Sequence, residues 1–389
     1  MSAVSGERVQ QPTRGDAFRP CLPNGSRRAF AIAARRVGEI GLFGCAPLLL
    51  VVGFALFAPR ETYAWDFHAF WGAAANVVHG RSPYLGFGAN ASGTPYPLYL
   101  YPPVLAEALA PLGTLPFAVA ATLFVTASIG AILYALWLLG VRDWRCYGAT
   151  FLWVPVLHGL RLGTLTPFLV LGLAVCWRLR ERKWMAPVLA AVVTSKLFLW
   201  PVMVMSASRR GLVSTIRLAC WTVACLIGSW AVIGFAGFTR YPSLLVSTQR
   251  VWVRGGYGFG GLLMRSGVSQ SAVSVALFAA AAACLAVLAR SSDDRVRFAG
   301  SIIVACGFSP AAWLHYAALL LVVVAIFQPY LGWAWVLPLA FWLSPREQAD
   351  GNVARVTIWT VVLIAVFVIA KRSGDEVAFP PVGVPQQRA

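Results

Sequence analysis

Long apolar segments separated by short polar ones constrain this chain more than any other feature of its sequence. A helix that crosses a membrane needs about 20 apolar residues. Of the 389 residues, 59% are hydrophobic and only 12% are charged, whereas soluble domains carry about 25% charged residues. Most of the chain must therefore face lipid or other apolar helices. The apolar segments are 38–58, 116–140, 148–160, 164–179, 185–207, 213–236, 271–290, 297–312, 314–328, 331–344 and 355–370.

Several of these segments are too short for a complete crossing, so we expect tilted, broken or half-length helices. Segment 185–207 holds Lys196 in its middle and Pro201 soon after, which predicts two short helices that meet at a break. With that segment counted twice, the sequence predicts an all-α, polytopic membrane protein of roughly twelve transmembrane helices. Its membrane domain covers residues 37–371, between polar cytoplasmic tails at 1–36, predicted as disordered, and 372–389.

The basic residues indicate the orientation. The net charge is +18, from 32 basic and 14 acidic residues, and with twelve spans every basic cluster falls on one side. The positive-inside rule makes that side cytoplasmic. The basic residues are dispersed between apolar segments, so nucleic acid is not an expected partner. The clusters are Arg27, Arg28, Arg35 and Arg36; Arg142 and Arg145; Arg178, Arg180, Arg182 and Lys183; Arg209, Arg210 and Arg217; Arg290, Arg295 and Arg297; and Lys371 and Arg372.

This topology predicts a multi-pass protein of the cell (inner) membrane, with outer loops at about 60–103 and 237–270. Within the first loop, Asp66 begins a stretch whose apolar residues have helical spacing, which predicts an amphipathic helix lying in the membrane interface. From periodicity alone, Asp66 is an N-cap. The alternative is a general base that faces an outer cavity. His68 does not share the helical face of Asp66, and it is a surface or binding residue rather than a partner in catalysis. The apolar positions are Phe67, Phe70, Trp71, Ala74 and Val78.

The same loop ends in alternating Tyr and Pro, from Pro95 to Pro103 and including Tyr101. This pattern resists helix and favours a rigid extended segment. It is either an aromatic belt at the membrane interface or a wall for a sugar or lipid. Glu107 follows in a short amphipathic stretch and is a weaker alternative to Asp66 as a catalytic carboxylate.

Cations on the outer side are the next candidates. Lys196 lies inside an apolar segment, where an ionisable residue is costly and is a functional candidate by default; after Thr194 and Ser195, it suits an anion such as a phosphate. Arg161 either snorkels to the interface or takes part in function. Arg254 departs from the positive-inside pattern, and an anionic lipid or phosphate would explain it. His315 is either a structural histidine or a donor to a leaving phosphate.

Other chemistries find no support in the sequence. We find no HExxH, no closely paired Asp motif and only four His residues, so no metal site is expected. No Walker or dinucleotide-binding motif is present, so the sequence does not favour ATP-driven transport or redox chemistry. We expect no cofactor.

The first outer loop resembles that of the family-87 glycosyltransferases, which are GT-C-type membrane enzymes. The resemblance covers most of residues 60–330, and it continues through Lys196-Leu197-Phe198 and through Ser309-Pro310 with Trp313 and His315. The family includes polyprenol-phosphate-mannose-dependent α-mannosyltransferases. The residues that carry it in the loop are Asp66-Phe67, Phe70-Trp71, Ala74, Gly80, Pro83-Tyr84, Tyr101-Pro102-Pro103 and Pro111-Leu112.

The resemblance implies an inverting transfer of a hexose, with mannose as the expected sugar. A polyprenyl-phosphate sugar enters from the outer leaflet, and Asp66 deprotonates a hydroxyl of a glycolipid or glycan acceptor. Polyprenyl phosphate leaves, and Lys196 and His315 match family positions that would bind its phosphate. Arg161 and Arg254 are added to that set from topology. His68, Tyr101 and Trp313 are candidate substrate contacts.

Two departures from the family pattern concern the sugar. Family members often have Gly-Gln-x-Asn where this chain has Gly163-Thr164-Leu165-Thr166, and the His-rich pattern after Trp313 is reduced to His315-Tyr316. A transporter or flippase for an anionic lipid or sugar is the alternative function. It would favour internal repeats and paired broken helices, but the sequence shows one broken segment and no clear repeat. A structural membrane subunit would leave Lys196 and the outer arginines unexplained.

Overall fold

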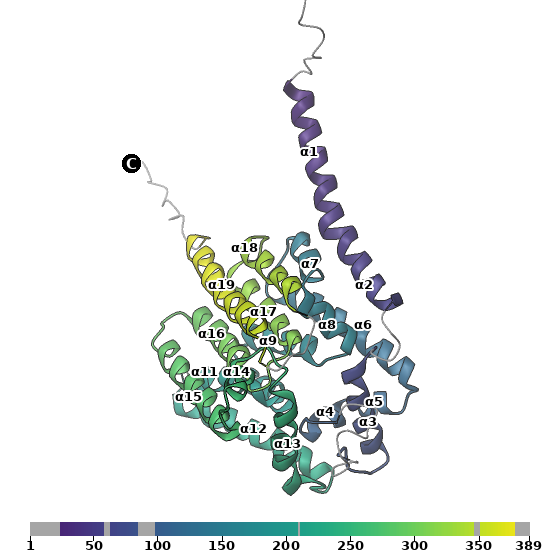
Figure 1. Ribbon diagram of the computed structural model, residues 1–389, viewed down its shortest axis with the longest axis vertical. Coiled ribbons are helices and arrows are strands. Elements are labelled where there is room, and N and C mark those ends of the chain that lie inside the picture. The colour runs from purple at the N-terminus through teal and green to yellow at the C-terminus, as the bar shows by residue number, and fades with distance from the viewer. Residues whose placement is uncertain (1–23, 58–62, 85–97, 209–210, 346–350, 378–389) are drawn as a thin grey trace, which may run out of the picture.

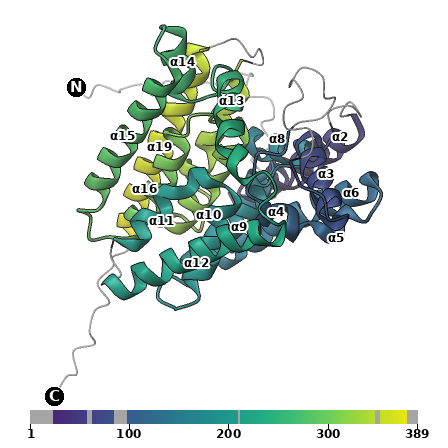
Figure 2. The ribbon, with the colours of Figure 1, turned by 90° about the horizontal axis from the view of Figure 1, so that it is seen from below.

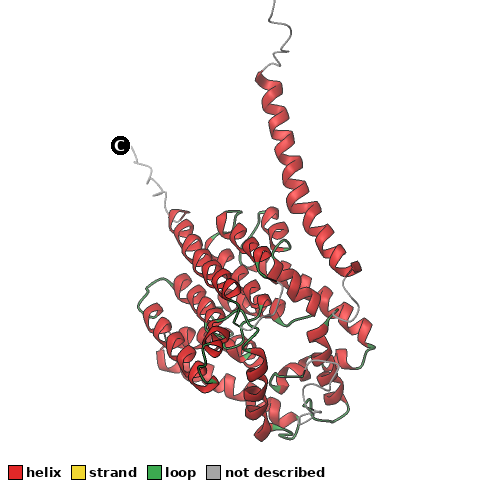
Figure 3. Cartoon of the chain, in the orientation of Figure 1, coloured by secondary structure: helices red, strands yellow, loops and turns green. Residues whose placement is uncertain are grey.

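The computed structural model describes residues 24–57, 63–84, 98–208, 211–345 and 351–377. Within these ranges the secondary structure is entirely helical, with no strand (Figure 3). The predicted all-α class is therefore confirmed. Residues 95–97 of the predicted extended segment lie outside the described residues, as does part of each predicted tail.

The first half of the described chain forms the helices around the first outer loop and the first apolar segments (Figure 1). They are α1 (Asn24–Ile40), the π-helix η1 (Gly41–Cys45), α2 (Ala46–Phe57), α3 (Trp65–Val78), α4 (Pro103–Ala108), α5 (Ala110–Gly113), α6 (Phe117–Leu138), α7 (Trp144–Thr150), α8 (Val154–Leu162), α9 (Thr166–Arg178) and α10 (Met185–Ser195).

The second half continues with helices of mixed length. They are η3 (Leu197–Leu199), α11 (Trp200–Ala207), α12 (Gly211–Val232), η4 (Phe238–Arg240), α13 (Tyr241–Trp252), α14 (Phe259–Arg265), α15 (Gln270–Leu288), α16 (Asp294–Gly307), η5 (Leu314–Leu319), α17 (Leu320–Phe327), α18 (Trp333–Val336), η6 (Leu337–Leu343) and α19 (Val353–Val377).

Five helices in the described residues are long and apolar enough to cross a membrane. A sixth span results if α8 and α9, which meet at an angle of 117°, are counted as one broken crossing. Other apolar helices are only half-length, as expected, so the predicted count of twelve spans is not reached by complete helices. The five are Ala31–Gly53, Phe117–Leu138, Gly211–Val232, Gln270–Leu288 and Val353–Arg372.

The break predicted around Lys196 is present. Helix α10 ends at Ser195, Lys196 has an extended backbone with φ −152° and ψ 98°, and a short 3₁₀ turn begins at Leu197. Pro201 then lies in the first turn of α11, where its missing N–H costs no helical hydrogen bond. Lys196 is therefore held at a junction between two half-length helices.

The regions predicted as tails and loops contain more helix than expected. Helix α1 begins at Asn24, so residues 24–36 of the predicted disordered tail are helical. This segment is rich in Ala and Arg, which are strong helix formers. Helix α19 likewise continues to Val377, and the predicted outer loop 237–270 contains η4, α13 and α14.

The helices gather the first outer loop at one end of the molecule. In Figure 1, α3, α4 and α5 lie together at the bottom, whereas α1 begins and α19 ends toward the top. Seen from below, α3, α4 and α5 again lie side by side (Figure 2). Tyr241, at the start of α13, ties this group to the later helices, because its hydroxyl donates to the Leu100 carbonyl at 3.1 Å.

A glycine fixes the approach of α3 to the bend between α8 and α9. Gly163 caps α8 with φ +63°, in the left-handed region that favours glycine. A Cβ at this position would lie 2.8 Å from Cβ of Phe67 on α3. The backbone of the bend therefore packs directly against the first turn of α3.

We expect Gly163→Ala to lower the apparent unfolding temperature more than Gly80→Ala does. Both glycines have a positive φ, but a Cβ at Gly80 meets no atom within 4 Å. Gly80→Ala, the control, therefore loses only the free energy of unfolding that a positive φ costs a residue with a Cβ, about 1–2 kcal/mol. In Gly163→Ala, crowding against Phe67 lowers the free energy of unfolding by about 1–3 kcal/mol more. The two variants would be compared by thermal unfolding in detergent, and equal losses would contradict the packing described.

Candidate active site

The segment before Asp66 sets the direction of α3. Ala64 is fully buried and has φ +53°, uncommon for a residue with a side chain. Its N–H donates to the Arg161 carbonyl at 2.8 Å, which anchors it to the end of α8. Ala64 is the N-cap of α3 and the helix begins at Trp65, so the prediction that Asp66 is the N-cap is wrong. Asp66 lies within the first turn, where the helix dipole favours a negative charge.

The predicted apolar face of α3 packs against protein. Phe67 and Phe70 are buried, and the Phe67 ring stacks on Phe124 of α6 at 4.5 Å between ring centroids. Phe70 meets Tyr101 edge-on at 5.0 Å. Val78 departs from the predicted face, because it is 42% exposed. The face is therefore a protein contact, and the position of α3 at the membrane surface stays a prediction.

Two tyrosines surround the Lys196 ammonium. Its Nζ donates to the Tyr101 hydroxyl at 3.0 Å and lies 5.0 Å from the centre of the Tyr101 ring. The ring of Tyr316 lies 4.6 Å away. Both distances are within the range of cation–π attraction. Lys196 is 8% exposed, so these contacts stabilise a charge that is nearly removed from water.

Asp66 supplies the charge that opposes Lys196. Burial raises the pKa of the Asp66 carboxyl, the Lys196 ammonium lowers it, and the result is a pKa of about 6. Burial also raises the pKa of Tyr101 well above its ordinary value, and the charges of Tyr316 and Asp66 add to that increase. Tyr101 therefore stays protonated, whereas Asp66 changes its charge close to neutral pH.

Glu107 differs from Asp66 in its electrostatic partners. Burial raises the pKa of its carboxyl, and its charge acts on Tyr84. Lys196, by contrast, has Asp66 as the carboxylate that acts on it. Asp66 is therefore the stronger of the two candidate bases that the sequence offers.

The bend between α8 and α9 comes close to His315. A Cβ on Gly159 would lie 3.2 Å from Thr164 Oγ1 and 3.4 Å from His315 Cβ. His158 stacks on His315 with ring centroids 6.1 Å apart, and His315 meets Tyr316 edge-on at 4.8 Å. His315 is buried, and within the described residues neither ring nitrogen has a hydrogen-bond partner.

The remaining candidate substrate and phosphate contacts differ in how far they are exposed. His68 stacks on Phe117 at 3.6 Å and is partly exposed. Trp313 is partly buried against the core that holds Tyr316. Arg161 is in the last turn of α8, beside Ala64. Arg254 is exposed, on a segment whose Tyr257 N–H donates to the Ala312 carbonyl at 2.7 Å.

Tyr316 was missed as a site residue by reasoning from the sequence. It is 120 positions from Lys196, and an aromatic residue beside a membrane helix has many structural uses. The one available signal is its place directly after His315. In the fold, the Phe198 ring stacks on Tyr316 at 4.5 Å and holds it toward the break at Lys196.

The arrangement joins a carboxylate that titrates near neutral pH to a nearly buried cation. The carboxylate can accept a proton from a hydroxyl group, and the cation can stabilise a developing anion. In the part of the chain that the structure describes, no three His, Cys, Asp or Glu side chains gather as a metal site would require.

Comparison with known proteins identifies the family of this chain. The model of glycosyltransferase family 87 matches residues 99–314. The polyprenol-phosphate-mannose-dependent alpha-(1-2)-phosphatidylinositol pentamannoside mannosyltransferase of Mycobacterium tuberculosis (strain CDC 1551 / Oshkosh) is 25% identical over 387 residues, covering 88% of this chain and 81% of the relative. The comparison with solved structures gave no match.

The family match includes Tyr101, Lys196 and Arg254, and it begins after Asp66. The case for Asp66 therefore depends on its electrostatic interaction with Lys196 rather than on the match. Because the match covers more than half of the chain, this protein belongs to glycosyltransferase family 87 and is a membrane glycosyltransferase.

Proposed function

We propose that the protein transfers a hexose, mannose, from a polyprenyl-phosphate donor to a glycolipid or glycan acceptor at the outer face of the cell membrane. The observation that carries the proposal is the electrostatic interaction between the Asp66 carboxylate and the Lys196 ammonium, which two tyrosines hold in place. The name of the mycobacterial relative supports both the sugar and the lipid-linked donor.

In the proposed reaction, Asp66 accepts the proton of an acceptor hydroxyl. The hydroxyl oxygen forms a bond to the anomeric carbon while the bond from that carbon to the donor phosphate breaks on the opposite side. The configuration at the anomeric carbon inverts, and polyprenyl phosphate carries away the bonding electron pair. A base with a pKa of about 6 is mostly ionised at neutral pH and is therefore ready to accept a proton.

Lys196 is the proposed partner of the donor phosphate. Negative charge grows on the leaving phosphate, and a preorganised cation in a water-poor site stabilises that charge strongly. We place His315, Arg161 and Arg254 in the same role. His315 is closest to the centre, because it contacts Tyr316, which lies against Lys196.

Three aromatic side chains are proposed to contact substrate. Tyr101 bridges Phe70 on the helix that bears Asp66 and the ammonium of Lys196. His68 and Trp313 are both partly exposed, His68 on α3 and Trp313 just before η5. Aromatic faces of this kind pack well against the apolar faces of sugars and against lipid chains.

Lipid analysis of a deletion strain tests the proposed function. We expect the strain to accumulate a glycolipid or glycan that is one hexose shorter than the product of the parent strain. A plasmid copy of the wild-type protein should restore the product, whereas an Asp66→Asn copy should not. An unchanged set of mannosylated products in the deletion strain would contradict the proposal.

The rate of transfer should depend on the ionisation of Asp66. Only the ionised carboxylate acts as a base, so the rate should fall about tenfold for each pH unit below about 6. The measurement is the initial rate in proteoliposomes between about pH 4.5 and 8, with protein integrity checked at each pH. A rate that begins to fall only near pH 3.8, the ordinary pKa of an Asp carboxyl, would contradict the buried environment assigned to Asp66.

A further inference from the structure

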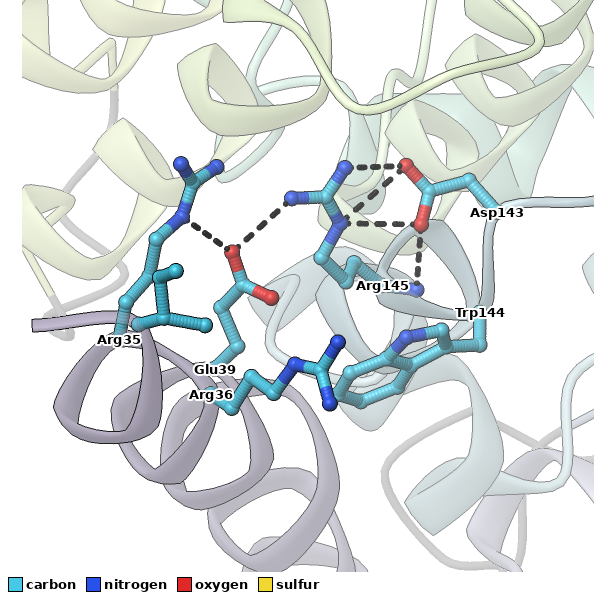
Figure 4. Close-up of a pocket in the computed structure, with 7 residues that line it drawn as sticks. Arg35, Arg36, Glu39, Asp143, Trp144 and Arg145 are labelled. Carbon is cyan, nitrogen blue, oxygen red and sulfur yellow. Dashed lines mark hydrogen bonds and ion pairs between the residues drawn. The ribbon is translucent and has the colours of Figure 1, made fainter. Parts of the chain in front are cut away.

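A second charged site lies at the opposite end of the molecule from α3. A cavity of about 410 Å³ opens between α1 and the start of α7 (Figure 4). Three arginines and two acids line it together with one apolar and one aromatic side chain. The lining residues are Ile32, Arg35, Arg36, Glu39, Asp143, Trp144 and Arg145.

Ion pairs hold two of the three arginines in place. Glu39 Oε1 accepts from Arg35 Nε at 3.0 Å and from Arg145 Nη1 at 3.2 Å, which links α1 to α7. Arg145 also pairs with Asp143, at 2.9 Å between Nη2 and Oδ2. The hydrogen bonds from Arg145 lower the pKa of Asp143, so this carboxylate stays ionised. These ion pairs therefore fix the positions of Arg35 and Arg145 in the wall of the cavity.

Arg36 is different from the other two arginines. Its side chain is exposed, and among the described residues it forms no ion pair. Three guanidinium groups thus face two carboxylates in the cavity, and the excess positive charge lies with Arg36. An anion of about the size of a phosphate group would complete the balance of charge.

The position of the cavity specifies the source of that anion. The apolar span Ala31–Gly53 begins in its wall, and the span Phe117–Leu138 ends shortly before Asp143. The cavity therefore lies where two membrane spans end, at the level of lipid headgroups. Trp144 is 47% exposed and Ile32 is 57% exposed, and a half-exposed tryptophan among basic residues is typical of this level of a membrane.

The surface of the first span points to acyl chains beside the cavity. Only 6% of the most apolar part of the span Ala31–Gly53 is buried inside the protein. Lipid tails therefore have an apolar surface to cover directly next to the basic cavity. A soluble phosphate would use the arginines but leave this surface unexplained. The exposed apolar residues of the span include Val37, Ile40, Leu42, Leu48 and Leu49.

We propose that the cavity between α1 and α7 binds the headgroup of an anionic phospholipid, with Arg36 as the principal contact to its phosphate and the first span as the support for its acyl chains. The site is independent of the proposed transfer reaction, because it shares no residue with the region around Asp66. Its ligand is a structural lipid of the leaflet at which α1 begins.

Binding of phosphatidylglycerol to the full-length protein in neutral detergent tests this proposal, by native mass spectrometry at several lipid concentrations. Arg36→Gln should weaken phosphatidylglycerol binding by about fivefold, as expected for one arginine at a membrane surface. Arg290→Gln is the matched control, because Arg290 is an exposed arginine that follows α15. In Figure 1, α15 lies on the other side of the bundle from α1 and α7. Arg290→Gln should leave the dissociation constant unchanged.

Two control ligands in the same experiment distinguish an anionic phospholipid from other ligands of the cavity. Phosphatidylcholine should bind more weakly than phosphatidylglycerol and should not respond to Arg36→Gln, and inorganic phosphate should not displace bound phosphatidylglycerol at equal concentration. Displacement by inorganic phosphate would overturn the proposal in favour of a soluble anion. Equal binding of both lipids, or no effect of Arg36→Gln on phosphatidylglycerol binding, would also overturn it.

Discussion

Replacing Asp66 with Asn is expected to reduce sugar transfer by about 10²- to 10⁴-fold, the usual contribution of a positioned general base. Asn has almost the same shape as Asp and can remain in the first turn of α3. It cannot accept a proton from the acceptor hydroxyl, however. The loss should therefore appear in the rate of transfer at saturating substrate, with donor binding weakened much less.

Glu107→Gln is the matched control for the Asp66 variant. It removes another acid of the same outer region. Burial also raises the pKa of the Glu107 carboxyl, but Asp66 is the carboxylate that acts on Lys196. We expect transfer within about threefold of wild type, since no interaction with the reacting groups is lost. A large loss in this variant with full activity in Asp66→Asn would reverse the assignment of the base.

Replacing Lys196 with Met is expected to lower transfer by about 10²- to 10³-fold, comparable to the removal of one electrostatic stabiliser of a transition state. Met retains the length and apolar stem of Lys but removes the ammonium from between Tyr101 and Tyr316. The charge that lowers the pKa of Asp66 also disappears. The acid limb of the pH–rate profile should therefore move to a higher pH in this variant.

The shift of the acid limb distinguishes an electrostatic role from a structural one. Loss of packing alone would lower the rate without moving the limb. Lys183→Met provides the control, because Lys183 is exposed in the turn between α9 and α10 and is remote from Asp66 in sequence. It should keep both the rate and the profile of the wild type. A Lys196→Met protein with an unchanged limb would contradict direct coupling to Asp66.

Particular elements of this fold could be predicted because local chemistry determines them. A lysine in an apolar segment followed by a proline left few alternatives to a break, and the break occurs at Lys196. The junction between His158 and Thr166 likewise contains a glycine with positive φ that ends one helix before the next begins. Both features depend on a few neighbouring residues.

Other features depend on contacts between distant segments. The start of α3 is set by the hydrogen bond from the Ala64 N–H to the Arg161 carbonyl, so periodicity placed the N-cap two residues late, at Asp66 instead of Ala64. Tyr316 reaches Lys196 only through the packing of η5 beside Phe198. The predicted number of spans is not confirmed, because several apolar helices are half-length and other helices bury them.

The most direct test is to reconstitute the purified protein in proteoliposomes with polyprenyl-phosphate-mannose that is radiolabelled in the sugar, together with a lipid extract from the deletion strain as acceptor. We predict that the label moves from the donor to a larger glycolipid in the wild-type sample and stays on the donor with Asp66→Asn. Label that crosses the bilayer while still attached to the donor, with no labelled product, would contradict the glycosyltransferase mechanism and indicate a transporter.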